Sequence, residues 1–256
     1  MSNIYSAPQS ELRHAPSTDE YGSVERAVNG DYHFVIGEVV NEAWEKTRGT
    51  KGTILLALGL YILVYAAVAF ASQVVLSALG LASVPESDGG NMGSVMAFNL
   101  LQNMLVTVST MPLMLGVFIL GLRRAVDAPL SVASIMNHYD KTVPLAVTLV
   151  MMYVMLTIGF ILLIVPGIYL SIAYYMALPL VVEKGMSPWQ AMETSRKAVG
   201  KRWFAVFGLC MVIGLINMLG TLAFGVGLVW TIPFTVIAFG ILYRNMFGCE
   251  AATVAS

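Results

Sequence analysis

Four long stretches of this chain contain no charged residue: 52–85, 89–122, 142–182 and 203–243. A helix that crosses the hydrocarbon core of a bilayer needs about 20 mostly apolar residues, so each of the last two stretches has room for two crossings. Each of the first two has room for one crossing and a loop. Only 11% of the residues are charged, whereas a soluble domain is about one quarter charged. The sequence therefore predicts a multi-pass membrane protein and excludes a soluble one.

Six transmembrane helices fit into these stretches, and we expect an all-α polytopic membrane helix bundle built from three hairpins. Helices are expected because a backbone exposed to lipid must satisfy its own hydrogen bonds. From the order of the apolar residues, the expected spans are Ile54–Leu76, Val95–Leu120, Val143–Val165, Ile168–Val182, Phe204–Leu222 and Leu228–Phe247.

Lysine and arginine gather on one side of this arrangement. The segments that connect spans on the other side, 83–94, 166–167 and 220–227, contain neither residue. All fourteen Lys and Arg residues then lie on the same side as both termini. Cytoplasmic loops of membrane proteins carry an excess of Lys and Arg, so we expect cytoplasmic N- and C-termini.

The chain divides into three regions. Residues 1–33 are polar and interrupted by Pro8 and Pro16, which predicts a disordered cytoplasmic tail. Residues 34–248 form the six-span transmembrane domain with its amphipathic cytoplasmic helices, and residues 249–256 form a short cytoplasmic C-terminal tail.

A spaced pattern suggests an internal threefold repeat. The motif Thr-x-Pro occurs at Thr110 and again at Thr231. In both places an arginine follows eleven residues after the proline. Each pair of spans also follows a short amphipathic segment, at 34–46, 130–138 and 188–199. These features predict three units of surface helix plus hairpin, related by an axis along the membrane normal, as in the parallel repeats of some transporters. Convergent membrane patterning is the alternative explanation.

The segment 183–203 combines a capped, basic, amphipathic helix with tryptophan residues. Tryptophan favours the membrane interface, and basic clusters at the cytoplasmic face attract anionic lipids. Arg196 falls near the centre of the apolar face, where it either extends its guanidinium to the headgroups or pairs with a lipid phosphate or a polar group of the bundle. The candidate lipid- or partner-binding residues are Trp189, Arg196, Lys197, Lys201 and Arg202.

Polar residues are few within the spans, and the only charged one is Arg244 at the inner end of the last span. Intramembrane ionisable groups mark proton relays and many ion pathways, so their scarcity counts against a proton-coupled pump. The polar cluster that remains consists of Asn99, Gln102, Asn103 and Asn217. These amides either hydrogen-bond between helices or contact a substrate in a cavity that reaches the midplane.

Motifs of catalysis are missing from the sequence. It has no phosphate-binding glycine loop, no zinc signature and no nucleophile elbow. We therefore expect no enzymatic activity, no cofactor and no metal. Nucleic acid is not an expected partner, because membrane topology already accounts for the basic loop.

The segment 164–203 resembles a known family. P-G-I-Y-L, then A-L-P-L-V-V, then a Ser-Pro-Trp helix with Ala191, Ser195 and Arg196, is similar to bacterial six-helix inner-membrane proteins. That family includes the membrane domain of some glycerophosphodiester phosphodiesterases and the stand-alone YciC-like proteins. The resemblance extends over roughly residues 34–248 and implies an integral bundle in the bacterial inner membrane. The phosphodiesterase catalytic domain has no counterpart here.

The function expected from the sequence is a non-enzymatic scaffold, regulator or accessory subunit of envelope components. The alternative is a transporter or lipid-handling permease for a neutral or lipid substrate. Expected partners are membrane lipids, with anionic headgroups at the cytoplasmic face, and other membrane proteins or further copies of the chain.

Overall fold

The part of the chain that the structure describes, residues 21–80, 92–222 and 224–255 of a computed structural model, is built from helices. Short turns connect most of them. In chain order they are α1 (Val24–Asn29), α2 (Ile36–Thr47), α3 (Lys51–Ala78), α4 (Met92–Ala125), the 3-10 helix η3 (Val132–Lys141), α5 (Thr142–Leu162), α6 (Ile164–Ala173), α7 (Ala177–Glu183), α8 (Pro188–Lys201), α9 (Trp203–Leu222), α10 (Leu228–Phe247) and α11 (Ala251–Ala255).

Six of the described helical segments are long and apolar enough to cross a membrane. They are α3, α4, η3 continued by α5, α6 continued by α7, α9 and α10. The expected spans and the all-α fold class are therefore confirmed, and the chain is a multi-pass membrane protein.

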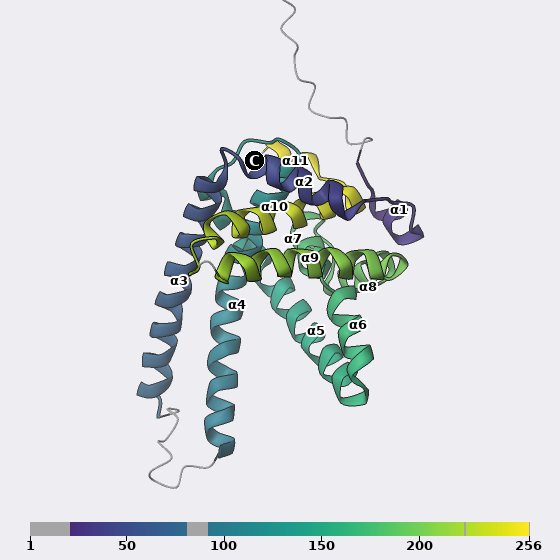
Figure 1. Cartoon of the computed structure of the whole chain (residues 1–256). Coiled ribbons are helices and arrows are strands. Elements are labelled where there is room, and N and C mark those ends of the chain that lie inside the picture. Colours follow the sequence, from purple (N-terminus) through teal and green to yellow (C-terminus); the bar gives the residue numbers. More distant parts are fainter. Residues whose placement is uncertain (1–20, 81–91, 223, 256) are drawn as a thin grey trace, which may run out of the picture.

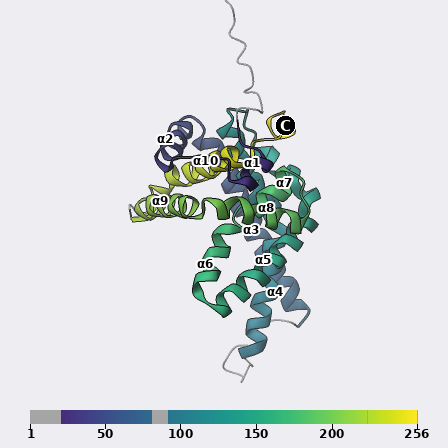
Figure 2. The ribbon, with the colours of Figure 1, turned by 90° about the vertical axis from the view of Figure 1, so that its right-hand side faces the viewer.

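Two hairpins extend in one direction, and the third lies across their ends. α3 and α4 form one leg, and α5 and α6 form a second leg, while α9 and α10 run across the upper ends of both in Figure 1 and are again transverse to the legs in Figure 2. The Lys51 ammonium lies 5.1 Å from the centre of the Trp230 ring, so the start of α10 is next to the start of α3. The sequence-based topology placed the 220–227 turn and Lys51 on opposite sides of the membrane. The structure brings them together.

The contact between α4 and α10 explains this arrangement. These two helices pack on each other more extensively than any other described pair. They meet at Gly121 and Gly240, where a Cβ on either residue would clash with the backbone of the other helix. Paired small residues allow helix backbones in membranes to approach this closely. The absence of side chains at this point lets α10 cross α4 instead of lying alongside it.

The two helices that carry the Thr-x-Pro and arginine pattern are the same two that pack together. Thr110 and Arg123 are buried on α4, and Thr231 and Arg244 are buried on α10. The middle unit of the expected threefold repeat lacks the pattern: its Pro179 has neither a threonine two residues before it nor an arginine eleven residues after it. The pattern thus relates α4 to α10, and the threefold repeat stays a prediction.

A serine of α8 joins the two halves of the fourth span. The Ser195 hydroxyl donates to the Ala173 carbonyl at 2.7 Å and accepts from the Met176 backbone N–H at 3.2 Å. These backbone groups lie where α6 ends and before α7 begins, and Ser195 is completely buried. A break in a membrane helix needs such partners for its freed backbone groups, so Ser195 stabilises the junction.

The ends of the chain depart from the expected tails. Residues 1–20 of the expected disordered tail lie outside the described residues, but residues 21–33 contain α1, and Ala27 and Tyr32 are buried against the helices. At the other end, Cys249 is buried and α11 contacts α4. Apolar side chains in both segments contribute to the core, which polar composition alone did not predict.

Candidate functional site

The five candidate residues of the basic helix separate into two groups. Trp189, Arg196 and Lys197 lie on α8, and the exposed Trp189 is in its first turn. Lys201 and Arg202 lie where α8 ends and α9 begins. The second group lines a groove.

Arg196 and Lys197 are neutralised in part by one glutamate of their own helix. The Arg196 guanidinium donates two hydrogen bonds to Glu193, at 2.8 and 3.0 Å, and the Lys197 ammonium lies 3.3 Å from the same carboxylate. The bond from Arg196 holds the pKa of Glu193 below its usual range. Arg196 therefore has its charge partner within α8, a pairing that the sequence interpretation did not consider.

Lys201 and Arg202 line an apolar groove between α6 and the junction of α8 with α9. We call it the basic groove. Its volume is about 700 Å³. The lining residues are Val165, Ile168, Tyr169, Gly200, Lys201, Arg202, Trp203, Phe204 and Ala205. The turn expected at 166–167 is wrong: these residues lie within α6, and the break between α5 and α6 is at Leu163. Val165, near the start of α6, lines the same groove as Lys201.

Two aromatic residues form a fixed wall of the basic groove. The Trp203 indole N–H donates to the Tyr169 carbonyl at 3.1 Å, and the two rings stack with centroids 6.0 Å apart. Trp203 also stacks on Phe207. Gly200 leaves room for the Tyr169 hydroxyl, which would lie 3.0 Å from a Cβ at that position. The wall is therefore set by contacts within the protein.

The basic groove is lined by two cations and by no acidic residue, and among the described residues no carboxylate forms an ion pair with Lys201 or Arg202. The Arg202 guanidinium lies 5.8 Å from the centre of the Tyr32 ring, and the Tyr32 hydroxyl donates to the Ala198 carbonyl. Burial raises the pKa of Tyr32 to about 12 although Arg202 opposes the shift, so Tyr32 is neutral at physiological pH.

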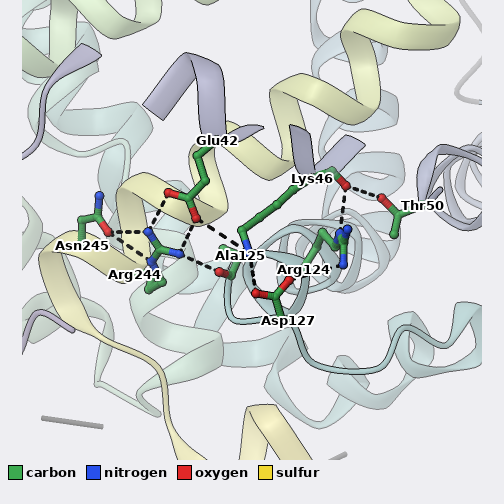
Figure 3. A network of polar contacts seen from close by, with 8 residues as sticks. All are labelled: Glu42, Lys46, Thr50, Arg124, Ala125, Asp127, Arg244 and Asn245. Carbon is green, nitrogen blue, oxygen red and sulfur yellow. Dashed lines mark hydrogen bonds and ion pairs between the residues drawn. The ribbon is translucent and has the colours of Figure 1, made fainter. Parts of the chain in front are cut away.

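A second polar site joins α2, α4 and α10 (Figure 3). The Arg244 guanidinium forms a two-pronged pair with Glu42, at 2.7 and 2.9 Å, and donates to the Ala125 carbonyl at 2.6 Å. Arg244 lies 5.0 Å from the Tyr21 ring centre and is only 9% exposed. We call Arg244, Glu42 and the Ala125 carbonyl the Arg244 clamp. Planar two-pronged pairing of this kind fixes position as well as charge.

The polar contacts continue from the Arg244 clamp along α2 (Figure 3). The Lys46 ammonium lies 2.7 Å from Asp127, and the Arg124 guanidinium donates to the Lys46 carbonyl at 2.8 Å. Asp127 adopts a left-handed backbone conformation just after α4, with φ of 55°, which aspartate tolerates better than most residues. Its side chain thereby anchors the end of α2 to the end of α4.

A buried carboxylate holds the C-terminal segment. The Glu183 side chain is 0% exposed and accepts from the Tyr243 hydroxyl at 3.0 Å and from the Glu250 backbone N–H. The Lys184 ammonium lies 3.4 Å from it. Glu183 therefore joins α7, α10 and the segment that leads into α11.

The predicted intramembrane polar cluster does not converge. The exposed amides of Asn99 and Asn103 donate to backbone carbonyls of their own helix, α4, and Gln102 lies on the same helix. The Asn217 amide on α9 instead donates to the Thr235 hydroxyl on α10 at 2.7 Å. Asn217 thus acts between helices, as one of the two sequence interpretations held.

The sequence did not predict the residues that organise the Arg244 clamp and the basic groove. Glu42 lies in the segment 34–46, which was expected only as an amphipathic surface segment. Arg244 was noted as part of the Thr-x-Pro pattern and as the one charged residue within a span, without a partner. Nothing local in the sequence connects two residues 202 positions apart. Tyr169 appeared in the sequence analysis only as the tyrosine of the P-G-I-Y-L stretch, which was part of the family resemblance.

Within the described ranges, no three His, Cys, Asp or Glu side chains are grouped so that they could hold a metal ion. Comparison of the chain with protein-family models, curated proteins and solved structures found no match.

Proposed function

We propose that this membrane protein is a non-enzymatic scaffold, regulator or accessory subunit of envelope components in the bacterial inner membrane. It acts from α2, the adjoining ends of α4 and α10, and α8. The Arg244 clamp carries the proposal, because one buried guanidinium holds α2 to both α4 and α10. A surface helix fixed in this way presents the same side chains at all times, as a docking platform must.

The use of charged groups supports a role without catalysis. Glu42, Glu183 and Glu193 each hold a helix or a basic side chain in place. A general acid or base must reach a substrate, whereas Glu183 is enclosed by the protein. These carboxylates stabilise the platform.

The platform faces the cytoplasm in this proposal. The Arg244 clamp and its extension contain Lys46, Arg124 and Arg244, and α8 adds four more basic residues up to Arg202. Such an excess of Lys and Arg is typical of the cytoplasmic side. The resemblance of residues 164–203 to bacterial six-helix inner-membrane proteins supports the same location.

The alternative is a transporter or lipid-handling permease, and one observation favours its lipid-handling form. The basic groove connects cationic residues at the start of α9 with apolar side chains of α6. The amides of Asn99 and Asn103, which a substrate pathway would use, are bonded within α4. The scaffold proposal fits this local bonding better.

Site-specific photo-crosslinking in cells tests the proposal. A photoreactive amino acid replaces Glu45 on α2 or Trp189 on α8, both exposed on the platform. Phe70 and Leu100, which are exposed on the apolar spans α3 and α4, provide control positions. We expect a reproducible adduct with one membrane protein from the platform positions and not from the control positions.

Two results would contradict the proposal. One is the formation of the same adducts from all four positions, which would indicate random encounters in the membrane. The other is the complete absence of protein adducts together with lipid movement in proteoliposomes, which would favour the permease.

A further inference from the structure

We propose that the basic groove binds one anionic phospholipid, with its phosphate on Lys201 and Arg202 and an acyl chain along the apolar wall. This site goes beyond the scaffold role and does not depend on it. Its basis is the placement of two cations beside exposed apolar side chains of two membrane-spanning segments.

Charge selects an anion for this groove. Lys201 and Arg202 contribute two positive charges, and none of the lining residues opposes them with a carboxylate. α8 ends at Lys201 and α9 begins at Trp203, so the partial charges of the two helix ends oppose each other here, and the two side chains supply the positive charge. A phosphate is matched to this setting, because arginine donates to phosphate through a planar fork and lysine adds a point charge.

The apolar part of the groove selects a lipid over a free anion. Val165 on α6 is 75% exposed and Phe204 on α9 is 84% exposed, and Ile168 also lines the groove. Both helices belong to segments that are apolar enough to cross a membrane, so these exposed side chains are suited to contact with hydrocarbon. An acyl chain is the part of a phosphate-bearing ligand that covers such a surface.

The shape of the groove is prepared before binding. Its volume of about 700 Å³ is within the range of ligand sites in proteins, about 300–1,000 Å³. The Trp203 indole N–H is already bonded to Tyr169, so the aromatic wall does not have to be ordered by the ligand. Binding then loses less conformational entropy than it would at a flexible surface.

The other basic residues of α8 do not form an equivalent site. Arg196 and Lys197 carry the same formal charge as Lys201 and Arg202, but Glu193 neutralises them in part. They also lie outside the groove lining. This difference supplies a matched control from the same helix and its junction.

Native mass spectrometry of the purified full chain tests the site. The probes are phosphatidylglycerol, which is anionic, and phosphatidylcholine, which is zwitterionic. The test variant is Lys201→Gln/Arg202→Gln, and the control variant is Arg196→Gln/Lys197→Gln, which removes the same charge. Loss of charge-assisted hydrogen bonds should weaken phosphatidylglycerol binding about tenfold more in the test variant than in the control.

Two further experiments distinguish a lipid from a free anion and show whether a variant has lost affinity by misfolding. Inorganic phosphate should compete poorly with phosphatidylglycerol, whereas a site for a free anion would lose the lipid at equal phosphate concentration. The variant Lys201→Gln/Arg202→Lys should recover part of the affinity if the charge at position 202 contacts the lipid. Each variant is compared with the wild-type chain for thermal stability in the same detergent.

Equal losses in the test and control variants, equal binding of the two lipids, or efficient competition by inorganic phosphate would each overturn the proposal. None of these outcomes bears on the crosslinking test of the scaffold role, which probes the exposed platform rather than the groove.

Discussion

Replacement of Glu42 by glutamine should destabilise the folded protein measurably, because it leaves the Arg244 guanidinium without its charge partner. Arg244 and Glu42 meet through two short bonds, and their side chains are 11% and 31% exposed. Breaking a buried pair costs about 3–5 kcal/mol, whereas an exposed pair contributes about 0–1 kcal/mol. Since Glu42 is partly exposed and glutamine retains one acceptor oxygen, we expect a loss of about 2 kcal/mol.

The assay is reversible unfolding of the purified chain in mixed micelles, followed by circular dichroism as the fraction of denaturing detergent rises. Glu45→Gln is the matched control, since it removes the same charge from an exposed position of the same helix. The free energy of unfolding of this control should stay within about 0.5 kcal/mol of wild type.

A double-mutant cycle isolates the pair itself. Arg244→Gln also removes the bond to the Ala125 carbonyl, so it should cost more than Glu42→Gln. The double variant should be more stable than the sum of the two losses predicts, because neither charge is left alone. Equal stabilities of the Glu42→Gln and Glu45→Gln variants, or strict additivity in the cycle, would refute the role assigned to the Arg244 clamp.

Three further predictions concern other contacts. Gly240→Ala should disrupt the α4–α10 crossing and lower the yield of folded protein, whereas Gly37→Ala, with open space around it, should be tolerated; size-exclusion profiles compare the two. Glu193 has a pKa below its usual value of about 4.3, so its pairing stabilises the fold above that pH and is lost as the pH falls through the folded-state pKa. The difference in melting temperature between wild type and Glu193→Gln should therefore be present at neutral pH and vanish in acid, and a constant difference would contradict the pairing. Glu183→Gln should release the C-terminal segment, which hydrogen exchange of α11 would detect, and unchanged protection there would rule out the anchoring contact.

The existence of the spans could be predicted because bilayer thickness sets the length of a span and the hydrocarbon core excludes charge. Both properties can be read from one continuous stretch of sequence. The stretch 142–182, for example, has no charge and twice the length of one crossing. α9 and α10 begin and end within one residue of the expected positions, whereas α5 ends at Leu162 instead of Val165 and α6 begins at Ile164 instead of Ile168.

The orientation of the third hairpin could not be predicted in the same way. It depends on the approach of Gly121 to Gly240 and on the pairing of Glu42 with Arg244, and both contacts join distant parts of the chain. Glycine is also common in membrane helices for other reasons, so neither residue stood out. Patterning rules treat each hairpin as independent and therefore arranged all three alike.

The candidate site was predictable in part. The basic character of segment 183–203 indicated the correct region, and Lys201 and Arg202 were among the candidates. Their difference from Arg196 and Lys197 arises from the position of Glu193 and from the contact of Tyr169 with Trp203. The second of these contacts depends on tertiary packing that helical periodicity does not describe.

Crosslinking from position 45 in cells that carry Glu42→Gln tests the central claim most directly, because it couples the platform to its proposed partner. The account predicts that the protein adduct seen with wild type weakens strongly in Glu42→Gln at equal protein abundance, since α2 loses its attachment to α10. The adduct should persist in Lys201→Gln/Arg202→Gln, which leaves the Arg244 clamp intact. An adduct of unchanged strength in Glu42→Gln would contradict the claim that the Arg244 clamp builds the docking surface.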